Sequence, residues 1–334
     1  MNAVVGATCL LVAGLSWFLY GSELTSLLPF LSLADTSMPE SGAAPRLSPQ
    51  GVPYRDLPHI VNADGQHLFC RYWEPDSTPR ALAFISHGAA EHTGPYDEIG
   101  QKLKEMSVLA FGHDHVGHGQ SEGGRLEIKD FHIYVRDLLQ HVDLMKSRHP
   151  GLPVFIVGHS MGGAISILSA CERQSDFAGL VLIGPLVNVS AEMATPFKVF
   201  VVKVMSVLAP NLPIGSIESK LVSREPKAVA QFESDELVYK GRLRVSFGMQ
   251  LMAACASISE KMSSMTFPFY ILHGSDDKLC DIEGSKSLHE KAASKDKKIK
   301  IYEGAYHVLH HELPEVSESV LKEITSWISE RIPA

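Results

Sequence analysis

Ser160 lies between two glycines in the sequence Gly-His-Ser-Met-Gly at residues 158–162. A run of apolar, strand-forming residues precedes this pentapeptide, and small residues follow it. The pattern predicts a sharp turn from a strand into a helix, where the positions two before and two after the serine must lack bulk. Such a turn exposes the serine hydroxyl as a nucleophile. It also leaves the Met161 amide at a helix N-terminus, where it can face a developing oxyanion.

A second Gly-x-Ser-x-Gly match, with Ser121 at its centre, occupies residues 119–123. It follows the polar string 113–118, with no strand directly before it, and Gly-Arg rather than a helix start comes after it. Because the pattern alone is common, its context decides between the two copies. We interpret Ser121 as a loop residue.

A serine nucleophile needs a base to accept its proton and an acid to orient that base. In hydrolases built on this turn, the acid and then the base follow the serine, on loops after later strands. The loop after the apolar run 269–272 offers Asp276, Asp277 or, slightly later, Asp281 as the acid. His307 is the first histidine after the last expected strand, so it is the predicted base.

A second oxyanion donor is expected from the loop His-Gly-Ala-Ala at residues 87–90, because its small residues let the backbone approach a carbonyl group. Ala89 is the predicted donor beside Met161. His113, His115 and His118 resemble part of a zinc-binding run, but Gly117 stands where that run requires an aspartate. We therefore expect no metal and no cofactor, and interpret these histidines as shaping the edge of the active site.

The composition of the 334 residues limits the classes of function. A formal net charge of −8 argues against general nucleic-acid binding. The five cysteines are odd in number and widely spaced, which favours free thiols in a reducing compartment over a disulfide framework.

Short apolar runs alternate with helical patterns along most of the chain, which predicts an α/β fold with a mostly parallel sheet. The expected strands cover residues 67–72, 81–86, 108–111, 154–157, 180–183, 269–272 and 298–302. The alternation breaks at about residues 186–265, which predicts a helical cap inserted between the strand at 180–183 and the strand at 269–272. Within it, residues 197–208 are apolar on nearly every helical face, which is typical of a helix that is buried or lies against lipid.

The N-terminal residues 1–37 form an apolar leader with a charge-free stretch at 3–20. Eighteen such residues are just enough for a membrane span, but a signal peptide or a variable leader are alternatives. Residues 38–58 are rich in proline, serine and glycine and are predicted to be a linker. The hydrolase domain is then expected at 59–334.

From about residue 53 to 331 the chain resembles the monoglyceride lipases, serine hydrolases of the α/β-hydrolase fold. The matching stretches are residues 54–59, 86–89, 113–122, 158–163, 279–281 and 301–310. The resemblance implies Ser160 as nucleophile, Asp277 as acid and His307 as base, with oxyanion amides from Ala89 and Met161. It implies hydrolysis of monoacylglycerols, including 2-arachidonoylglycerol-type lipids, to a fatty acid and glycerol through an acyl-enzyme.

The resemblance further implies that the apolar cap docks on membranes and admits one acyl chain. A cytosolic, membrane-associated enzyme is expected, with the leader as an N-terminal anchor and a homodimer left open. Thiol sensitivity would rest mainly on Cys280, near the acid loop. The alternatives are a lysophospholipase or broad carboxylesterase, and, more remotely, a catalytically silent binding protein of the same fold.

Overall fold

The computed structural model describes residues 45–188 and 208–333. The predicted leader and nearly all of the apolar segment 197–208 therefore lie outside the described residues. Within the described ranges, no helix is both long and apolar enough to cross a membrane.

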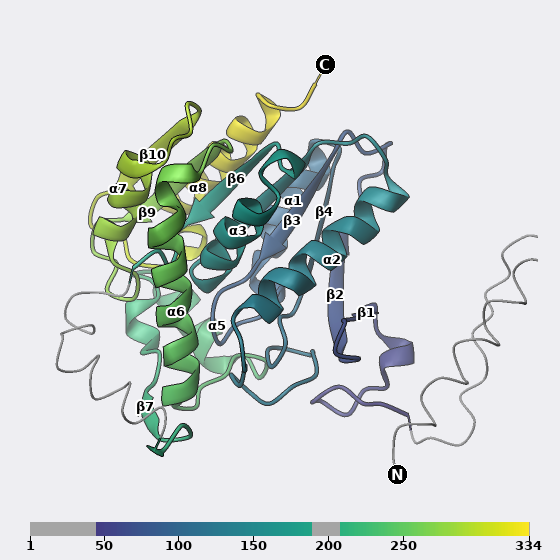
Figure 1. Ribbon diagram of the computed structural model, residues 1–334, viewed down its shortest axis with the longest axis vertical. Coiled ribbons are helices and arrows are strands. Elements are labelled where there is room, and N and C mark those ends of the chain that lie inside the picture. The colour runs from purple at the N-terminus through teal and green to yellow at the C-terminus, as the bar shows by residue number, and fades with distance from the viewer. Residues whose placement is uncertain (1–44, 189–207, 334) are drawn as a thin grey trace, which may run out of the picture. The chain divides into compact units, whose positions relative to one another are not determined.

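An eight-stranded sheet lies at the centre of the unit formed by residues 45–334 (Figure 1). Its spatial order is β1-β2-β4-β3-β5-β6-β9-β10. The strands are β1 (His59–Val61), β2 (His67–Trp73), β3 (Ala81–Ser86), β4 (Val108–His113), β5 (Val154–His159), β6 (Gly179–Ile183), β9 (Phe269–Gly274) and β10 (Lys297–Tyr302). The pairs β1–β2 and β2–β4 are antiparallel and the other pairs are parallel. The predicted α/β-hydrolase class with a mostly parallel sheet is confirmed.

Helices cover both faces of this sheet. The helices are α1 (Asp97–Glu105), α2 (His132–Arg148), α3 (Met161–Glu172), α5 (Pro226–Ser234), α6 (Val245–Lys261), α7 (Ile282–Lys291) and α8 (Pro314–Ser329). Apolar residues of α1 and α8 join one buried cluster, and those of α2, α3, α6 and α7 join another. Figure 1 shows the same division, with α2, α3 and α6 in front of the strands.

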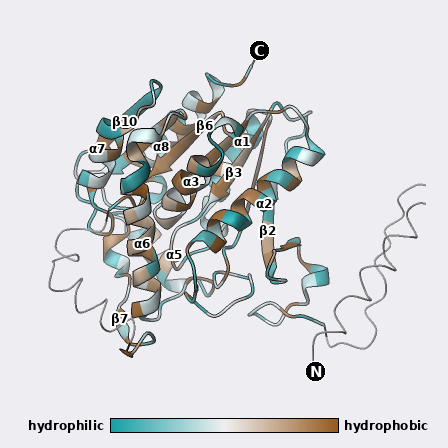
Figure 2. Ribbon diagram, viewed as in Figure 1, coloured by the Kyte–Doolittle hydropathy of each residue, from teal (hydrophilic) through white to brown (hydrophobic). Residues whose placement is uncertain are grey.

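The two clusters follow from the alternation of side chains along each strand. In β3, Leu82 and Phe84 belong to the cluster under α2 and α3, whereas Ala83 and Ile85 belong to the cluster under α1 and α8. Because both faces are covered, the central strands are apolar along most of their length, and they are mostly brown in Figure 2. Strand β10, at the edge, carries three lysines instead. Edge lysines discourage pairing with another sheet.

Between β6 and β9 the strand–helix alternation stops. In the described part of this segment, β7 (Pro213–Gly215) pairs antiparallel with β8 (Leu243–Arg244), with α5 between them in the chain, and α6 follows and packs on α3. Two hydrogen bonds join this segment to the loop after β3. The Tyr239 amide donates to the Ala90 carbonyl at 2.7 Å, and His92 Nε2 lies 2.8 Å from Asp235 Oδ2.

Residues 45–58, predicted as linker, pack against the unit that contains the eight-stranded sheet. Tyr54 is 2% exposed, and its hydroxyl donates to the Gln120 carbonyl at 2.7 Å. The backbone also forms a short turn in which Leu47 pairs with Pro53. Composition indicated a linker because proline, serine and glycine dominate, but one aromatic side chain is sufficient to anchor the segment.

Candidate active site

Ser160 occupies the joint between β5 and α3. Its backbone has φ 53° and ψ −121°, a conformation that residues other than glycine rarely adopt. The Ser160 amide donates to the Ile183 carbonyl at 3.0 Å, and its own carbonyl accepts from Gly163 and Leu186, each at 2.9 Å. The turn is thus held by the neighbouring strand and by the first turn of the helix, which stabilises the strained residue.

The two flanking glycines are required by close backbone contacts. A Cβ atom on Gly158 would collide with Ser166 Oγ and lie 2.7 Å from the Gly162 carbonyl oxygen. A Cβ atom on Gly162 would collide with the Ser86 carbonyl oxygen and lie 2.5 Å from that of His87. The turn from β5 into α3, called the elbow below, therefore lies at Gly162 directly against the end of β3, where the predicted oxyanion loop begins.

The structure separates the three candidate acids. Asp277 Oδ2 lies 2.7 Å from His307 Nδ1, across loops that follow β9 and β10. Asp276 is exposed, and Asp281 caps α7 by accepting from the Glu283 amide at 3.0 Å. Asp277 is therefore the candidate acid that contacts His307.

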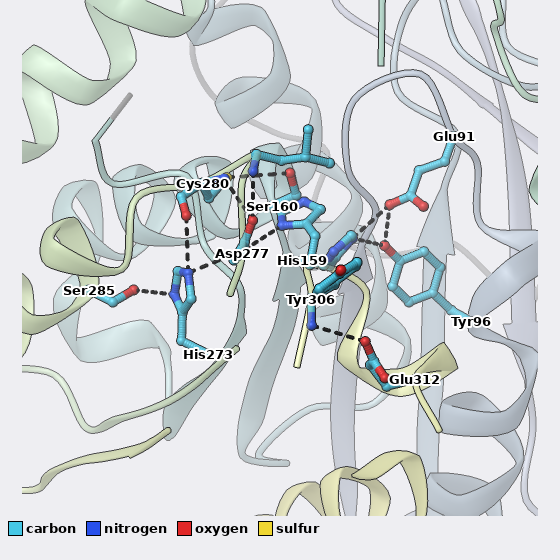
Figure 3. A network of polar contacts seen from close by, with 12 residues as sticks. Glu91, Tyr96, His159, Ser160, His273, Asp277, Cys280, Ser285, Tyr306 and Glu312 are labelled. Carbon is cyan, nitrogen blue, oxygen red and sulfur yellow. Dashed lines mark hydrogen bonds and ion pairs between the residues drawn. The ribbon is translucent and has the colours of Figure 1, made fainter. Parts of the chain in front are cut away.

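Asp277 is held as a buried carboxylate by partners on both oxygens. Oδ1 accepts from the amides of Leu279 and Cys280 at 2.8 and 3.0 Å. Oδ2 lies 3.2 Å from His273 Nε2 as well as near His307 (Figure 3). Burial by itself would raise the Asp277 pKa, but His307 and His273 outweigh it and hold that pKa well below its usual range. Burial likewise opposes protonation of His307, yet the Asp277 charge raises the His307 pKa.

The Ser160 hydroxyl contacts Cys280, with Oγ 3.9 Å from Sγ. Among the described residues, no hydrogen bond joins Ser160 Oγ to His307. The two side chains nevertheless share one edge of the sheet, because β5, β6, β9 and β10 are neighbours and their carboxyl ends align. Catalytic hydrogen bonds are often long in structures without substrate and shorten once the substrate is bound.

The two predicted oxyanion amides flank the elbow. Met161 is the first residue of α3, and Ala89 lies in the loop after β3. Neither amide donates to an acceptor within residues 45–188 and 208–333. A Cβ atom on Gly88 would lie 3.1 Å from Ser160 Cβ, so the loop touches the nucleophile. Free amides beside a serine and a histidine–aspartate pair can support acyl transfer.

A buried network next to Ser160 was not predicted. Glu91 Oε1 accepts from the Tyr96 hydroxyl and lies 2.9 Å from His159 Nδ1, and Tyr96 OH lies 2.8 Å from the same nitrogen (Figure 3). The His159 ring also packs 4.7 Å from that of His307. Although burial opposes ionisation, the neighbouring His159 keeps the Glu91 pKa well below its usual range. Tyr96 and Glu91 precede His159 by 63 and 68 positions. In the sequence, only the position of His159 next to Ser160 could have drawn attention to this network.

Ser121, in the second glycine-serine match, is a buried structural residue. Its Oγ donates to the Asp114 carbonyl at 2.5 Å and accepts from the Phe69 amide at 2.9 Å. The Asp114 carboxylate accepts hydrogen bonds from Thr93, in the loop after β3, and from the Gln120 amide. Among the described residues, no group of three or more His, Cys, Asp or Glu side chains is arranged to hold a metal ion.

Comparison with known proteins gives concordant matches. Residues 77–314 match the model of the serine aminopeptidase S33 family. The chain is 55% identical to the monoglyceride lipase of Homo sapiens, over 88% of this chain and 97% of that one. It is 35% identical to the monoacylglycerol lipase of Mycolicibacterium smegmatis, over 80% and 95%. The crystal structure of the Paleococcus ferrophilus monoacylglycerol lipase superimposes with a TM-score of 0.71 at 27% identity, over 79% and 99%.

Proposed function

The chain belongs to the monoglyceride lipases, within the serine aminopeptidase S33 family of α/β hydrolases, and from this premise we propose that it hydrolyses monoacylglycerols with Ser160, His307 and Asp277. One observation carries the assignment of residues. The strained serine at the β5–α3 joint shares a sheet edge with a buried Asp277–His307 pair at 2.7 Å. The substrate class is supported by relatives at 53–55% identity that carry the name monoglyceride lipase.

Acylation begins when Ser160 Oγ attacks the ester carbonyl and its proton moves to His307 Nε2. Asp277 holds Nδ1 of the same ring, which fixes the tautomer and stabilises the imidazolium that forms. The Ala89 and Met161 amides receive the oxyanion. Collapse of this intermediate breaks the ester bond, and His307 returns the proton to the departing glycerol oxygen.

Deacylation repeats the sequence with water. His307 takes a proton from the water that attacks the acyl-Ser160 carbonyl, and the second tetrahedral intermediate collapses to free fatty acid and Ser160. In this proposal the hydrogen bond between Ser160 Oγ and His307 Nε2 forms once substrate is bound, because Oγ lies next to Cys280 Sγ in the structure.

Exposed apolar side chains support the proposal that the protein associates with a membrane surface. Leu208, Leu212 and Ile214 are exposed by 74, 43 and 44% at the start of the described cap region. Apolar side chains of this kind insert at the bilayer interface, where single-chain glycerides reside. The proposal also includes activity on 2-arachidonoylglycerol-type lipids and a homodimer.

A liposome-binding experiment tests which part of the chain attaches to the membrane. Retention of the full chain, together with release of a variant that begins at Met38, would assign the attachment to the leader. Equal retention of the two proteins would assign it to the cap.

A substrate panel tests the function. Wild type and Ser160→Ala are assayed on monoacylglycerols of several chain lengths, a lysophospholipid and a short p-nitrophenyl ester. We expect the highest kcat/KM on a monoacylglycerol, and no turnover by Ser160→Ala. A preference for the lysophospholipid or the short ester would support the lysophospholipase or carboxylesterase alternative. Wild-type protein that binds these lipids without turnover would support the silent binding protein.

A further inference from the structure

The peptide group between Gly88 and Ala89 carries the N–H that the proposed function assigns to the oxyanion. A trans peptide group is planar, and its C=O and N–H point in opposite directions. All peptide bonds of the described chain are trans. The group that holds the Gly88 carbonyl therefore also sets the direction of the Ala89 N–H.

His87 holds that carbonyl. Its Nδ1 lies 2.8 Å from the Gly88 carbonyl oxygen, and its Nε2 lies 2.9 Å from the His115 amide nitrogen. A carbonyl oxygen only accepts and a backbone amide only donates, so Nδ1 carries the hydrogen and Nε2 is bare. The contacts select one neutral tautomer. Burial favours the same neutral form, because it lowers the His87 pKa to about 4.

The ring has little freedom to leave this position. His87 is fully buried, and its ring packs 4.1 Å from that of His115 and 5.3 Å from that of His118. On the other side, the Gly88 amide donates to Glu91 Oε1 at 2.5 Å. The peptide groups before and after Gly88 are thus each held by a buried side chain.

We propose that His87 is a positioning residue: its Nδ1–H holds the Gly88 carbonyl so that the opposite edge of the peptide group, the Ala89 N–H, is directed at the oxyanion. The role rests on the proposed function, because it needs an oxyanion beside Ser160. His87 does not touch substrate. It acts through one peptide plane, and the His115 amide keeps the required nitrogen protonated.

Two substitutions separate the two bonds of the ring. In His87→Asn, the side-chain amide nitrogen is as many bonds from Cβ as Nδ1 is, so the donor to Gly88 can be kept while the acceptor for His115 is lost. In His87→Gln, the amide oxygen replaces Nε2 as acceptor, and the donor to Gly88 is lost. Both remove the imidazole, and the smaller Asn leaves the larger void at this buried position, so packing loss alone would rank the two variants in the opposite order.

The readouts are kcat and KM on a monoacylglycerol and on p-nitrophenyl butyrate, the affinity for a trifluoromethyl ketone, and the thermal midpoint. A trifluoromethyl ketone forms a tetrahedral oxyanion on the serine, so its affinity reports on the oxyanion donors. Loss of one such donor costs about 100-fold or more in kcat. We expect His87→Gln to lose about that factor in kcat and in ketone affinity, with KM nearly unchanged, and His87→Asn to lose less than about tenfold.

Equal losses in the two variants, in proportion to their thermal midpoints, would overturn the proposal, as would wild-type kcat in His87→Gln. If neither variant folds, ¹⁵N-histidine NMR of the wild-type protein decides: a protonated Nδ1 and bare Nε2 on His87 support the role, and any other protonation state contradicts it. The p-nitrophenyl ester separates this test from that of the function. Wild type that cleaves this ester but no monoacylglycerol refutes the substrate class, and leaves the comparison of variants readable.

Discussion

The chain contains two copies of Gly-x-Ser-x-Gly, and the structure gives them opposite roles. Ser160 lies between β5 and α3, with φ 53°, and within residues 45–188 and 208–333 its hydroxyl has no backbone partner. Ser121 lies in a loop, fully buried, with its hydroxyl bonded to two backbone groups. The comparison shows that the glycines permit a tight turn in both places, but that the setting of the turn decides whether the serine hydroxyl is bonded to the backbone.

The largest contrast is expected between the two serine-to-alanine variants. Ser160→Ala removes the nucleophile and should lower kcat on a monoacylglycerol by about 10⁶-fold, as in other serine hydrolases. Ser121→Ala should keep kcat within a fewfold. It leaves the buried Phe69 amide without an acceptor, so its free energy of unfolding should fall by about 1–3 kcal/mol. Steady-state kinetics and urea denaturation measure both, and a larger kcat loss in Ser121→Ala would reverse the assignment.

The neighbouring aspartates give the next contrast. Asp277→Asn replaces the carboxylate that orients His307 and should lower kcat by about 10⁴-fold. Asp276→Asn alters an exposed side chain and serves as the matched control, with little expected change. Parallel kinetics at neutral pH decide between them. A greater loss in Asp276→Asn would place the acid one residue earlier.

Acid should affect the two regions with opposite signs. Near the Ser121 loop, burial lowers the pKa of His118 to about 3, against an ordinary value of 6.5. Below pH 6.5 the unfolded chain therefore binds a proton that the folded chain does not. This difference removes up to about 1.4 kcal/mol of stability per pH unit as the pH falls from 6.5 towards the folded pKa.

His307 behaves in the other direction. Its pKa is raised, so its contribution to stability is present at low pH and is lost as the pH rises through that raised value. Activity needs the neutral base, so kcat/KM should decline about tenfold per pH unit below it. Activity should then fall before the protein unfolds. Denaturation curves and pH–rate profiles over pH 4–9 check this order; a free energy of unfolding independent of pH would contradict it.

Chelation should have the smallest effect. The proposed chemistry uses a serine, a histidine and an aspartate, and the histidines beside Ser121 lack the aspartate that a zinc run needs, since Gly117 stands there. Full activity is expected after prolonged dialysis against EDTA. If turnover is lost and added zinc restores it, the loop that contains His113, His115 and His118 would have to be reconsidered as a zinc site.

Local patterns in the sequence predicted the sheet and the turn from strand to helix at Ser160, because each depends on residues close in the chain, and they placed the candidate base His307 in the loop after the last strand. The acid loop left three candidates, and only folding showed that Asp281 caps a helix while Asp277 reaches the histidine. The Glu91 network and the packing of Tyr54 could not be predicted. Both depend on contacts between residues more than sixty positions apart, for which periodicity and motif spacing give no signal.

The central claim is that Ser160, and not Ser121, is the nucleophile. Wild-type protein is treated with a fluorophosphonate, digested, and analysed by peptide mass spectrometry. The account predicts one equivalent of adduct, located on the peptide that contains Ser160 and absent from Ser160→Ala. Adduct on the Ser121 peptide, or unchanged labelling of Ser160→Ala, would contradict it.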